Sequence, residues 1–510
     1  MLESDLDVIV IGTGLANSIV AGALSKAGCK VAHIDKNPYY GSNEASLSAD
    51  ELIQWADSNP PGISSISRSG AAVPSSRQYS ISLAPSVLPS LGPQISSLIS
   101  SGVSKYTGFK LLKNINVVDA NGGIQPVPGN KEDVFKNKSI SLIEKRRLMR
   151  FLTFASGPEL ETAQELGGKE TMPFTQFLTE VFNLPLEMVS IIAYALAYCE
   201  SATDATLPAL QRIRTHLLSA GRYGPSSFLI GHYGGAGEIA QGFCRAAAVS
   251  GAIYILDKEI DEVHYDEATS LFAVTLPEFP DTLTCKIILA EESQLPTQLS
   301  ARRLPETYPS RRCARGIVII DTPLSFAGDG PRSIGEASDE EAAAVDTSIL
   351  VFPPNSLSNQ TWASSVTALV TGADTMSCPA GKWIVYLYTP LGEDQPVESA
   401  EALLRPYLDA VLARRLVPSS DPVKPLLSLF YVQNTLTHSA NAANSDNRMK
   451  ALITPPPSSV LPEMLDSAAL VAEGVFREVI TVVKQSQSDD EEIDFWPPIV
   501  DHEGDDDEVW

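Results

Sequence analysis

The sequence predicts a mixed α/β fold. A large domain of the dinucleotide-binding (FAD/NAD-binding-like) type, with mixed sheets, is joined to a smaller all-helical domain. Two observations lead to this fold class. Residues 7–35 follow the order strand, glycine turn, helix, strand, which opens folds of this type. Residues 131–226 then contain successive helical patterns inside a chain that otherwise mixes strands and helices, and such an insertion is typical of a separate domain.

Individual residues of the opening unit match a dinucleotide-type turn at all but one position. Residues 8–11 form a continuous apolar run, as expected for a parallel strand buried on both faces. Gly12 and Gly14 make the tight turn, and Asp35 ends the next strand, where a ribose-binding acid would stand. The third glycine of the G-x-G-x-x-G pattern is replaced by Asn17. We therefore predict the fold from this degenerate loop, but we expect no bound FAD or NAD.

The large domain is predicted to be discontinuous, comprising residues 1–130 and 227–484. Residues 57–77 are rich in Ser, Pro and Gly and are expected to form an exposed, mobile insertion. Strand patterns within residues 253–432 predict an antiparallel sheet beside the first layer. Residues 465–482 are predicted as the last helix.

The acidic tail, residues 485–510, follows that helix. Two acidic runs flank an apolar segment, residues 495–499. A solvated, disordered tail is the simplest interpretation. The alternative is that the apolar segment docks under some conditions, with its acidic flanks steering a basic partner.

Composition narrows the classes of function. The 510 residues include 62 acidic and 37 basic side chains, for a formal net charge of −25. The negative net charge argues against nucleic acid as a partner and against direct docking on anionic lipid. It favours partners that carry basic tails. The six cysteines form no C-x-x-C pair and the six histidines no spaced cluster, so we expect no disulfide framework and no metal site.

We expect a cytoplasmic protein. No apolar run approaches the roughly 18 residues of a membrane span, and the first strand begins too near Met1 for a signal peptide.

Four sequence blocks, taken in order, resemble one known family. They are residues 7–15 with 37–41 (DVIVIGTGL and NPYYG), residues 101–110 (SGVSKYTGFK), residues 144–152 (EKRRLMRFL), and residues 221–254, which contain GRYG and GEIAQGFCR. Together they are similar to the Rab GDP-dissociation inhibitor and Rab escort protein superfamily. The chain length, the divergent middle and the acidic tail favour the escort branch. Members share a flavoprotein-like fold without being known for redox catalysis, in keeping with Asn17.

The resemblance implies a Rab-binding platform at Tyr40, Glu238 and Arg245. Glu238 lies near a predicted helix start, where a negative charge is favoured, and Arg245 lies seven residues on, on the same helix face. Tyr106 and Phe109 are candidates for holding the apolar part of the GTPase C-terminal tail. Without the family blocks, each of these residues would be read as an ordinary helix-surface or core side chain.

The resemblance also implies that the helical domain shields the geranylgeranyl lipid and docks the catalytic transferase. Since an exposed geranylgeranyl group costs about 0.8 kcal/mol per CH₂, a carrier needs an apolar cleft between helices. Seven side chains are candidates for lining it, although ordinary bundle core is the simpler role for most: Phe174, Phe177, Leu178, Phe182, Met188, Ile191 and Ile192.

The implied function is that of a non-catalytic accessory component of Rab geranylgeranyltransferase. Such a protein binds GDP-bound Rab GTPases, presents their C-terminal cysteines for prenylation, shields the lipid and delivers the product during transient membrane contact. We expect no catalytic residues and no cofactor. Two alternatives stay open: a Rab GDP-dissociation inhibitor that only recycles prenylated GTPases and, more distantly, a flavin-dependent oxidoreductase.

Overall fold

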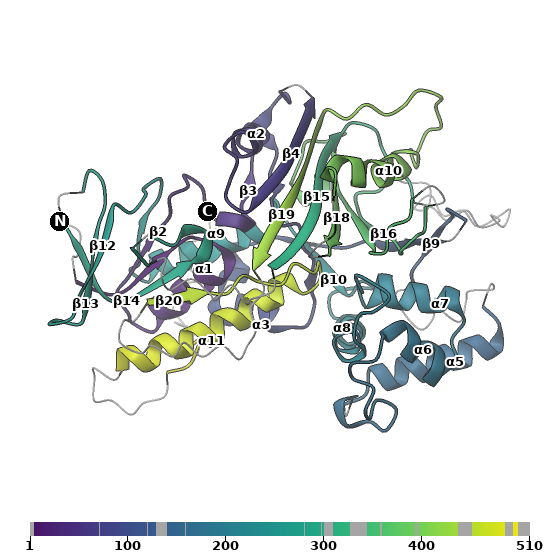
Figure 1. The fold of residues 1–510 in the computed structure, drawn as a ribbon, viewed down its shortest axis with the longest axis horizontal. Helices are drawn as coiled ribbons and strands as arrows, with labels where there is room; N and C mark the ends of the chain where they lie inside the picture. The colour runs from purple at the N-terminus through teal and green to yellow at the C-terminus, as the bar shows by residue number, and fades with distance from the viewer. Residues whose placement is uncertain are drawn as a thin grey trace, which may run out of the picture.

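The computed structural model describes most of the chain. The described residues are 5–70, 72–119, 121–128, 140–158, 160–279, 281–296, 298–299, 310–326, 344–357, 360–392, 395, 397–436, 451–484 and 493–497. Two large sheets lie side by side, and a group of helices lies beneath the second sheet (Figure 1). The fold is therefore mixed α/β, which confirms the predicted fold class.

The first sheet is the dinucleotide-type layer. Its strands follow the order β11-β2-β1-β14-β13-β12, and β20 also pairs with β14. The pairs β11/β2, β2/β1, β1/β14 and β14/β20 are parallel, whereas β12 and β13 form an antiparallel meander. The strands are β1 (Asp5–Ile11), β2 (Val31–Ile34), β11 (Ile253–Ile255), β12 (Glu262–Asp266), β13 (Leu271–Thr275), β14 (Leu283–Glu291) and β20 (Ala451–Thr454).

Helices cover one face of this sheet. Val8 and Val10 of β1 point into a core shared with the helices, while Ile9 and Ile11 point to the opposite face, which the meander covers. Successive residues of a strand face opposite ways, so the apolar run of β1 serves both layers. The helices are α1 (Leu15–Lys26), α3 (Pro93–Ser101), α9 (Ala236–Val249) and α11 (Met464–Lys484).

The second sheet has eight strands in the order β4-β19-β15-β18-β17-β16-β8-β9. Helix α10 (Ala400–Leu412) covers one face, where Val318 and Ile320 point, and Ile317 and Ile319 point to the other face. The strands are β4 (Ile63–Gly70), β8 (Asn114–Val118), β9 (Ile124–Pro126), β15 (Ser310–Ile320), β16 (Thr347–Phe352), β17 (Val366–Thr371), β18 (Trp383–Leu391) and β19 (Leu427–Leu436).

Strand β4 corrects the interpretation of residues 57–77 as a mobile insertion. Its residues are largely exposed, yet they pair with β19 at the edge of the second sheet. The serine-rich sequence lacks the apolar alternation that marks a strand. It is ordered because its backbone groups satisfy the edge of a neighbouring strand.

Short elements connect the two sheets. A three-stranded sheet has the order β6-β10-β7, and β3 pairs with β5. These elements are β3 (Ser46–Leu47), α2 (Ala49–Asp57), β5 (Ile81–Ser82), β6 (Leu88–Pro89), β7 (Phe109–Leu111) and β10 (Phe228–Gly231), with single helical turns η1 (Ser42–Glu44), η2 (Ser76–Gln78), η3 (Val103–Lys105), η4 (Leu160–Thr162), η6 (Glu292–Gln294) and η8 (Ala373–Thr375).

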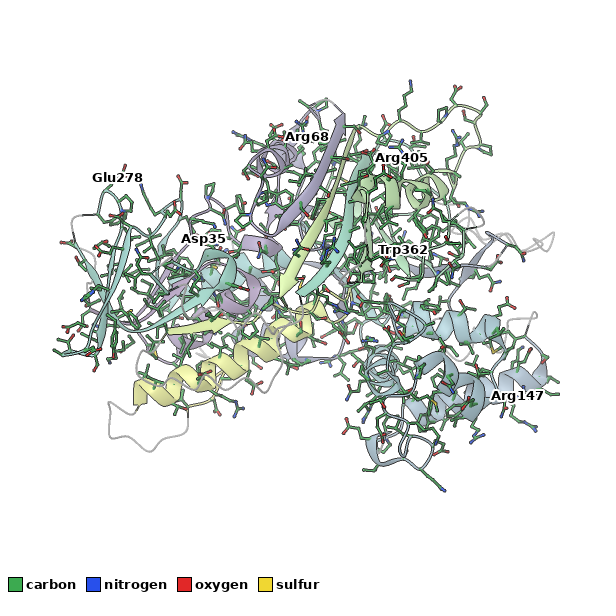
Figure 2. The ribbon with its side chains drawn as sticks, in the orientation of Figure 1. Asp35, Arg68, Arg147, Glu278, Trp362 and Arg405 are labelled. Carbon is green, nitrogen blue, oxygen red and sulfur yellow. The ribbon has the colours of Figure 1, made fainter. Side chains whose placement is uncertain are left out.

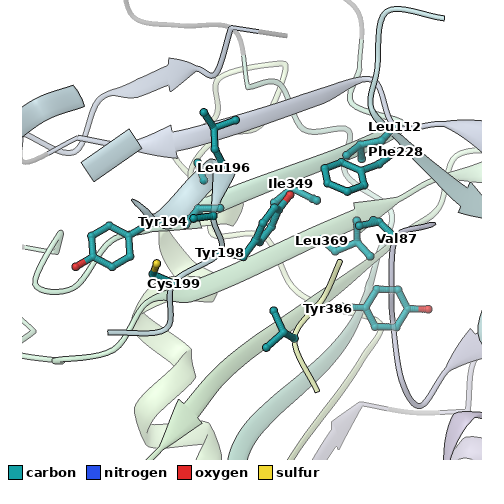
Figure 3. Packing of buried hydrophobic residues seen from close by; sticks show 14 of the residues in the cluster. Val87, Leu112, Tyr194, Leu196, Tyr198, Cys199, Phe228, Ile349, Leu369 and Tyr386 are labelled. Carbon is teal, nitrogen blue, oxygen red and sulfur yellow. The ribbon is translucent and has the colours of Figure 1, made fainter. Parts of the chain in front are cut away.

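The helical domain shares its core with the second sheet. Tyr194 and Tyr198 pack in one cluster with Ile349, Leu369 and Tyr386 of the sheet (Figure 3). The domain is therefore fixed against the sheet by apolar packing. Its helices are α5 (Leu142–Ala155), α6 (Phe174–Phe182), α7 (Leu186–Ser190), the π-helical η5 (Ile191–Leu196) and α8 (Thr206–Ser219).

Part of the C-terminal tail packs back on the first layer. The Trp496 ring stacks on Phe243 of α9 at 5.8 Å, and the Phe495 ring meets Phe476 of α11 at 5.3 Å. The rest of the predicted acidic tail, residues 485–492 and 498–510, lies outside the described residues. In the described part of the chain, no helix has both the length and the apolarity that crossing a membrane requires.

Candidate functional site

The turn before α1 shows how the chain uses its dinucleotide-type loop. Asp35, labelled in Figure 2, directly follows β2. Its side chain is fully buried. Its carboxylate accepts hydrogen bonds from the Thr13 amide at 2.7 Å and the Thr13 hydroxyl at 2.6 Å. It also accepts from the Asn37 amide, the Ser42 hydroxyl and Gln294 Nε2, at 2.8, 3.0 and 2.8 Å. The Asp35 carboxylate thus already accepts hydrogen bonds from the chain's own donors at both of its oxygens.

Two carboxylates occupy the N-terminus of α1. The Gly14 amide donates to Glu291 Oε1 at 2.5 Å, and the Leu15 amide donates to Glu44 Oε2 at 3.1 Å. Free amides at a helix N-terminus are where a phosphate group binds in dinucleotide-binding proteins. Burial raises the pKa of both carboxyls, and the negative charge of Glu44 raises the pKa of Glu291 further.

Asn17 fills the position of the missing glycine. Its side chain is fully buried, and Nδ2 donates to the carbonyls of Ile11 and Gly12 at 3.1 and 3.2 Å. Its Oδ1 accepts from the Thr454 hydroxyl at 2.5 Å. The carboxamide therefore ties α1 to the end of β1 and to β20. With Glu44 and Glu291 in the phosphate position, the residues at this turn do not fit a dinucleotide pyrophosphate.

Helix α9 forms the second part of the site. A Cβ on Gly41 would lie 3.3 Å from the Gly237 Cα, so the loop after β2 lies directly against the first turn of α9. This contact places the residue after Tyr40 against the residue before Glu238. The Tyr40 ring also meets the Tyr254 ring edge-on at 6.0 Å. Two segments more than 190 residues apart in the chain thus build one surface.

The charged groups of α9 are available for a partner. Glu238 is half-buried, and no hydrogen bond or ion pair to it occurs within the described ranges; burial raises the pKa of its carboxyl. Arg245 is exposed, and its guanidinium lies 4.5 Å above the Tyr106 ring. Since this ring supports the guanidinium, Arg245 is positioned before any partner arrives.

Of the two tail-binding candidates, Tyr106 is 44% exposed. Phe109 is half-buried and packs against the core under the helices. The structure therefore brings together Tyr40, Glu238, Arg245 and Tyr106, which we call the α9 surface, and turns Phe109 inward.

The seven lipid candidates lie in the helical core. Six of them are buried and Ile191 is partly buried, within one cluster of the described structure. Phe151 and Phe154 of α5 pack around Phe182 at ring distances of 5.2 Å. In this conformation the candidates face protein rather than solvent, so lipid would have to part the helices.

Sequence reasoning missed the two carboxylates at the α1 turn. Their signals were present: Glu291 and Glu292 directly follow the apolar run of residues 287–290, and Glu44 follows the NPYYG block. Among the residues that the structure describes, no cluster of His, Cys, Asp or Glu side chains is arranged to hold a metal ion.

Comparison with known proteins assigns the family. The GDP dissociation inhibitor family model matches residues 2–333. This chain belongs to the GDP dissociation inhibitor family. The predicted family is thereby confirmed, and with it the context in which the α9 surface is interpreted.

Relatives within the family carry two kinds of name. The chain is 31% identical to "Rab proteins geranylgeranyltransferase component A" of Saccharomyces cerevisiae, over 78% of this chain and 65% of the yeast protein. It is 30% identical to the Candida albicans protein of that name, over 75% of this chain and 59% of that protein. The chain thus spans less than two thirds of these two relatives. It is also 28% identical to the "Rab GDP-dissociation inhibitor" of S. cerevisiae, over 79% of this chain and 84% of that protein.

Solved structures agree on the fold. The Rab GDI of Plasmodium falciparum superposes with a TM-score of 0.67 at 17% identity, covering 93% of this chain and 98% of the other. An oxidoreductase from Methanosarcina mazei gives a TM-score of 0.55 at 13% identity, covering 92% and 100%. This chain therefore shares its fold both with a Rab GDI and with an oxidoreductase.

Proposed function

We propose that this protein is a Rab escort protein, the non-catalytic component of a Rab geranylgeranyltransferase. It binds unprenylated Rab GTPases in their GDP form, presents their C-terminal cysteines to the catalytic heterodimer and carries the prenylated product to membranes. The observation that carries the proposal is the α9 surface, where a carboxylate without a partner in the described structure and an arginine held over a tyrosine ring lie on one helix. Relatives named as component A of the transferase support the escort role.

The α9 surface suits recognition of switch segments. Tyrosine and arginine are the side chains most often found at the centres of protein interfaces. Glu238 and Arg245 stand seven residues, or about 10 Å, apart along the helix, so they reach two separate points of a partner. Because GTPase switch segments rearrange with the bound nucleotide, two fixed contacts of opposite charge discriminate between nucleotide states.

The lipid would enter the helical domain. The cluster around Phe177 and Phe182 supplies apolar surface of the required kind, and removing a prenyl chain from water provides the driving force. The same domain would dock the catalytic transferase. We place the protein in the cytoplasm, with transient membrane contact when the GTPase is delivered.

We also propose that the protein works without a flavin and catalyses no reaction of its own. Glu44 and Glu291 take up the α1 amides that a pyrophosphate would need, so these amides are not free to bind phosphate oxygens. The purified protein is expected to show no visible flavin absorption. A stoichiometric flavin spectrum would instead support the oxidoreductase alternative.

The escort role is tested by reconstituted prenylation. Catalytic transferase, geranylgeranyl diphosphate and a GDP-loaded Rab are combined with and without this protein, and lipid incorporation is measured. We expect labelling to depend on this protein. Arg245→Ala should weaken Rab binding about tenfold or more, the size of an interface hot spot, without lowering the unfolding temperature.

Arg405→Ala is the control variant, since it removes a partly exposed arginine of α10 that pairs with Glu401 and Asp409, away from the α9 surface. It should leave prenylation unchanged. If labelling needs no escort but the protein extracts prenylated Rab from membranes, the protein is a dissociation inhibitor. Equal loss with both arginine variants would argue against the α9 surface as the binding site.

A further inference from the structure

A tyrosine of β11 contacts both segments that build the α9 surface. Tyr254 is the middle residue of β11, and its ring meets the Tyr40 ring edge-on, with the two ring centres 6.0 Å apart. Its hydroxyl is hydrogen-bonded to the Cys244 thiol of α9. Tyr254 thus touches both the loop that carries Tyr40 and the helix that carries the two charged groups of the surface.

A buried histidine fixes the hydroxyl end of this tyrosine. The Tyr254 hydroxyl lies 3.3 Å from Nδ1 of His33, which is fully buried in β2. Nε2 of His33 lies 2.7 Å from the Gly12 carbonyl. A carbonyl can only accept, so Nε2 carries the proton. Burial lowers the pKa of His33 to about 4, so the ring is neutral near pH 7. Nδ1 of His33 therefore accepts the hydrogen bond that the Tyr254 hydroxyl donates.

The partners of Tyr254 are themselves anchored in the core of the first layer. Cys244 is buried, and its thiol lies 3.2 Å from the Ser18 hydroxyl of α1. The His33 ring lies 5.1 Å from the Tyr254 ring, and β2 directly precedes the loop that carries Tyr40. Because these contacts come from two different buried elements, they hold the Tyr254 ring in one orientation.

The Tyr254 ring is the support that the structure gives to the Tyr40 ring. Tyr40 is half-buried. In the described part of the chain, no second aromatic ring meets it and no hydrogen bond reaches its hydroxyl. A side chain that is already oriented loses less conformational freedom when a partner binds. The orientation of Tyr40 before binding is therefore set from below, by a residue that is not itself part of the α9 surface.

We propose that Tyr254 is a positioning residue for Rab binding: held by His33 and Cys244, it keeps the Tyr40 ring oriented beside α9 in the free protein. It acts through Tyr40 and not by touching the GTPase. This role rests on the proposed function, because its consequence is the affinity for Rab. The orientation of Tyr40 in the free protein is measurable without any partner.

The first test is the affinity of the full chain for a GDP-loaded, unprenylated Rab, measured by titration calorimetry. Tyr254→Leu removes the supporting ring and should weaken binding about three- to tenfold, the cost of ordering one side chain on binding. Tyr254→Phe keeps the ring and should lose less. In a Tyr40→Ala background, Tyr254→Leu should have no further effect, since the two residues act as one unit.

The matched control is Tyr265→Leu. Tyr265 is half-buried in β12, at the opposite end of the same sheet from β11, and its ring also meets a neighbouring ring, that of Phe272 at 4.9 Å. Loss of this ring should leave Rab affinity unchanged. Equal losses with Tyr254→Leu and Tyr265→Leu would show a general loss of stability and would overturn the positioning role.

A second readout needs no GTPase. The protein is labelled with 3-fluorotyrosine, and the fluorine NMR signal of Tyr40 is assigned by its absence in Tyr40→Phe. Tyr254→Leu should shift and narrow this signal, Tyr254→Phe should shift it less, and Tyr265→Leu should leave it in place. An unmoved Tyr40 signal, or an affinity loss that persists in the Tyr40→Ala background, overturns the proposal.

The two readouts separate the possible failures. If the wild type binds no Rab, the proposed function fails, and the fluorine signal still decides whether Tyr254 orients Tyr40. If Tyr254→Leu does not fold, Tyr254→Phe decides in the fluorine experiment, because it releases the ring from His33 and must shift the same signal.

Discussion

Single residues decide what the dinucleotide-type turn can do. Asn17 stands where helix and strand approach closely enough to favour glycine, and it is accommodated because both ends of its carboxamide find partners in Ile11, Gly12 and Thr454. A buried polar group with all its bonds made costs little, whereas an orphaned one costs about 1–3 kcal/mol. Asn17 therefore links α1 to β1 and β20 by hydrogen bonds, at the position where the dinucleotide-binding pattern has a glycine.

Buried histidines make stability depend on pH at the same scale. His216 of α8 is 5% exposed, packs on Phe228 at 5.2 Å, and has no hydrogen-bond partner for Nδ1 in the described structure. Burial lowers its pKa to about 4. Because the pKa of a histidine in the unfolded chain is about 6.5, its contribution is complete above pH 6.5 and is lost as the pH falls toward 4.

The variant His216→Leu tests this dependence. Between pH 6.5 and 4.5 it should lose about 2–3 kcal/mol less stability than the wild type, measured by denaturant unfolding at each pH. Asp466, whose pKa burial raises to about 6, acts in the opposite direction, but it is present in both proteins and cancels in the difference. Parallel pH profiles would contradict the prediction.

At the scale of elements, the α9 surface depends on close backbone contacts. Gly237 lies in the first turn of α9, and a Cβ there would overlap the Ser46 amide nitrogen of β3. Because backbone atoms cannot move aside easily, the glycine fixes how near α9 approaches the loop that carries Tyr40. Packing here overrides helix propensity, which favours alanine over glycine by about 1 kcal/mol.

The pair Gly237→Ala and Gly474→Ala tests this contact. Gly474 is an exposed position of α11 where an added Cβ meets nothing within 4 Å. Gly474→Ala should therefore stabilise the protein by about 0.5–1 kcal/mol. Gly237→Ala should destabilise it by about 1–3 kcal/mol through overpacking and should weaken Rab binding. Equal shifts in unfolding free energy would remove the argument for a close contact.

At the scale of the whole molecule, the helical domain is joined to the rest by apolar packing and by buried charges. One cluster of buried residues runs from α6 through η5 into the second sheet. Arg212 of α8 pairs with Glu463 at 3.0 Å and also donates to the Ala197 carbonyl. This junction is expected to unfold together with the large domain, in one calorimetric transition.

Arg212→Gln should weaken that junction. The variant leaves Glu463 without its cation, and we expect the free energy of unfolding to fall by roughly 2–4 kcal/mol. The loss should lie near the lower figure because the Glu463 side chain is 35% exposed. The calorimetric transition should move to lower temperature and broaden or split. Arg214→Gln, at a half-buried arginine of the same helix that has no ion pair in the described structure, should change neither. A separate transition for the helical domain in the wild type would contradict the shared core.

The described parts of the fold that were predictable from sequence are local. The run before Gly12, the glycine turn and the end of β2 at Asp35 appear in one short stretch, and periodicity marked the helices of residues 131–226. Strand β4 was not predictable because its polar sequence is ordered by β19, more than 350 residues later. The site divides in the same way, since the family blocks pointed to Tyr40, Glu238 and Arg245, but nothing local pointed to Glu44 and Glu291.

The sequence by itself determined the fold class, the family and the loss of the third glycine, because each is written in contiguous residues whose spacing has a direct physical meaning. Only the tertiary structure decided which groups meet. It placed two carboxylates at the α1 amides and Arg245 over Tyr106. These arrangements depend on side chains up to 277 residues apart. Burial and charge act through distances in space, which sequence spacing does not fix.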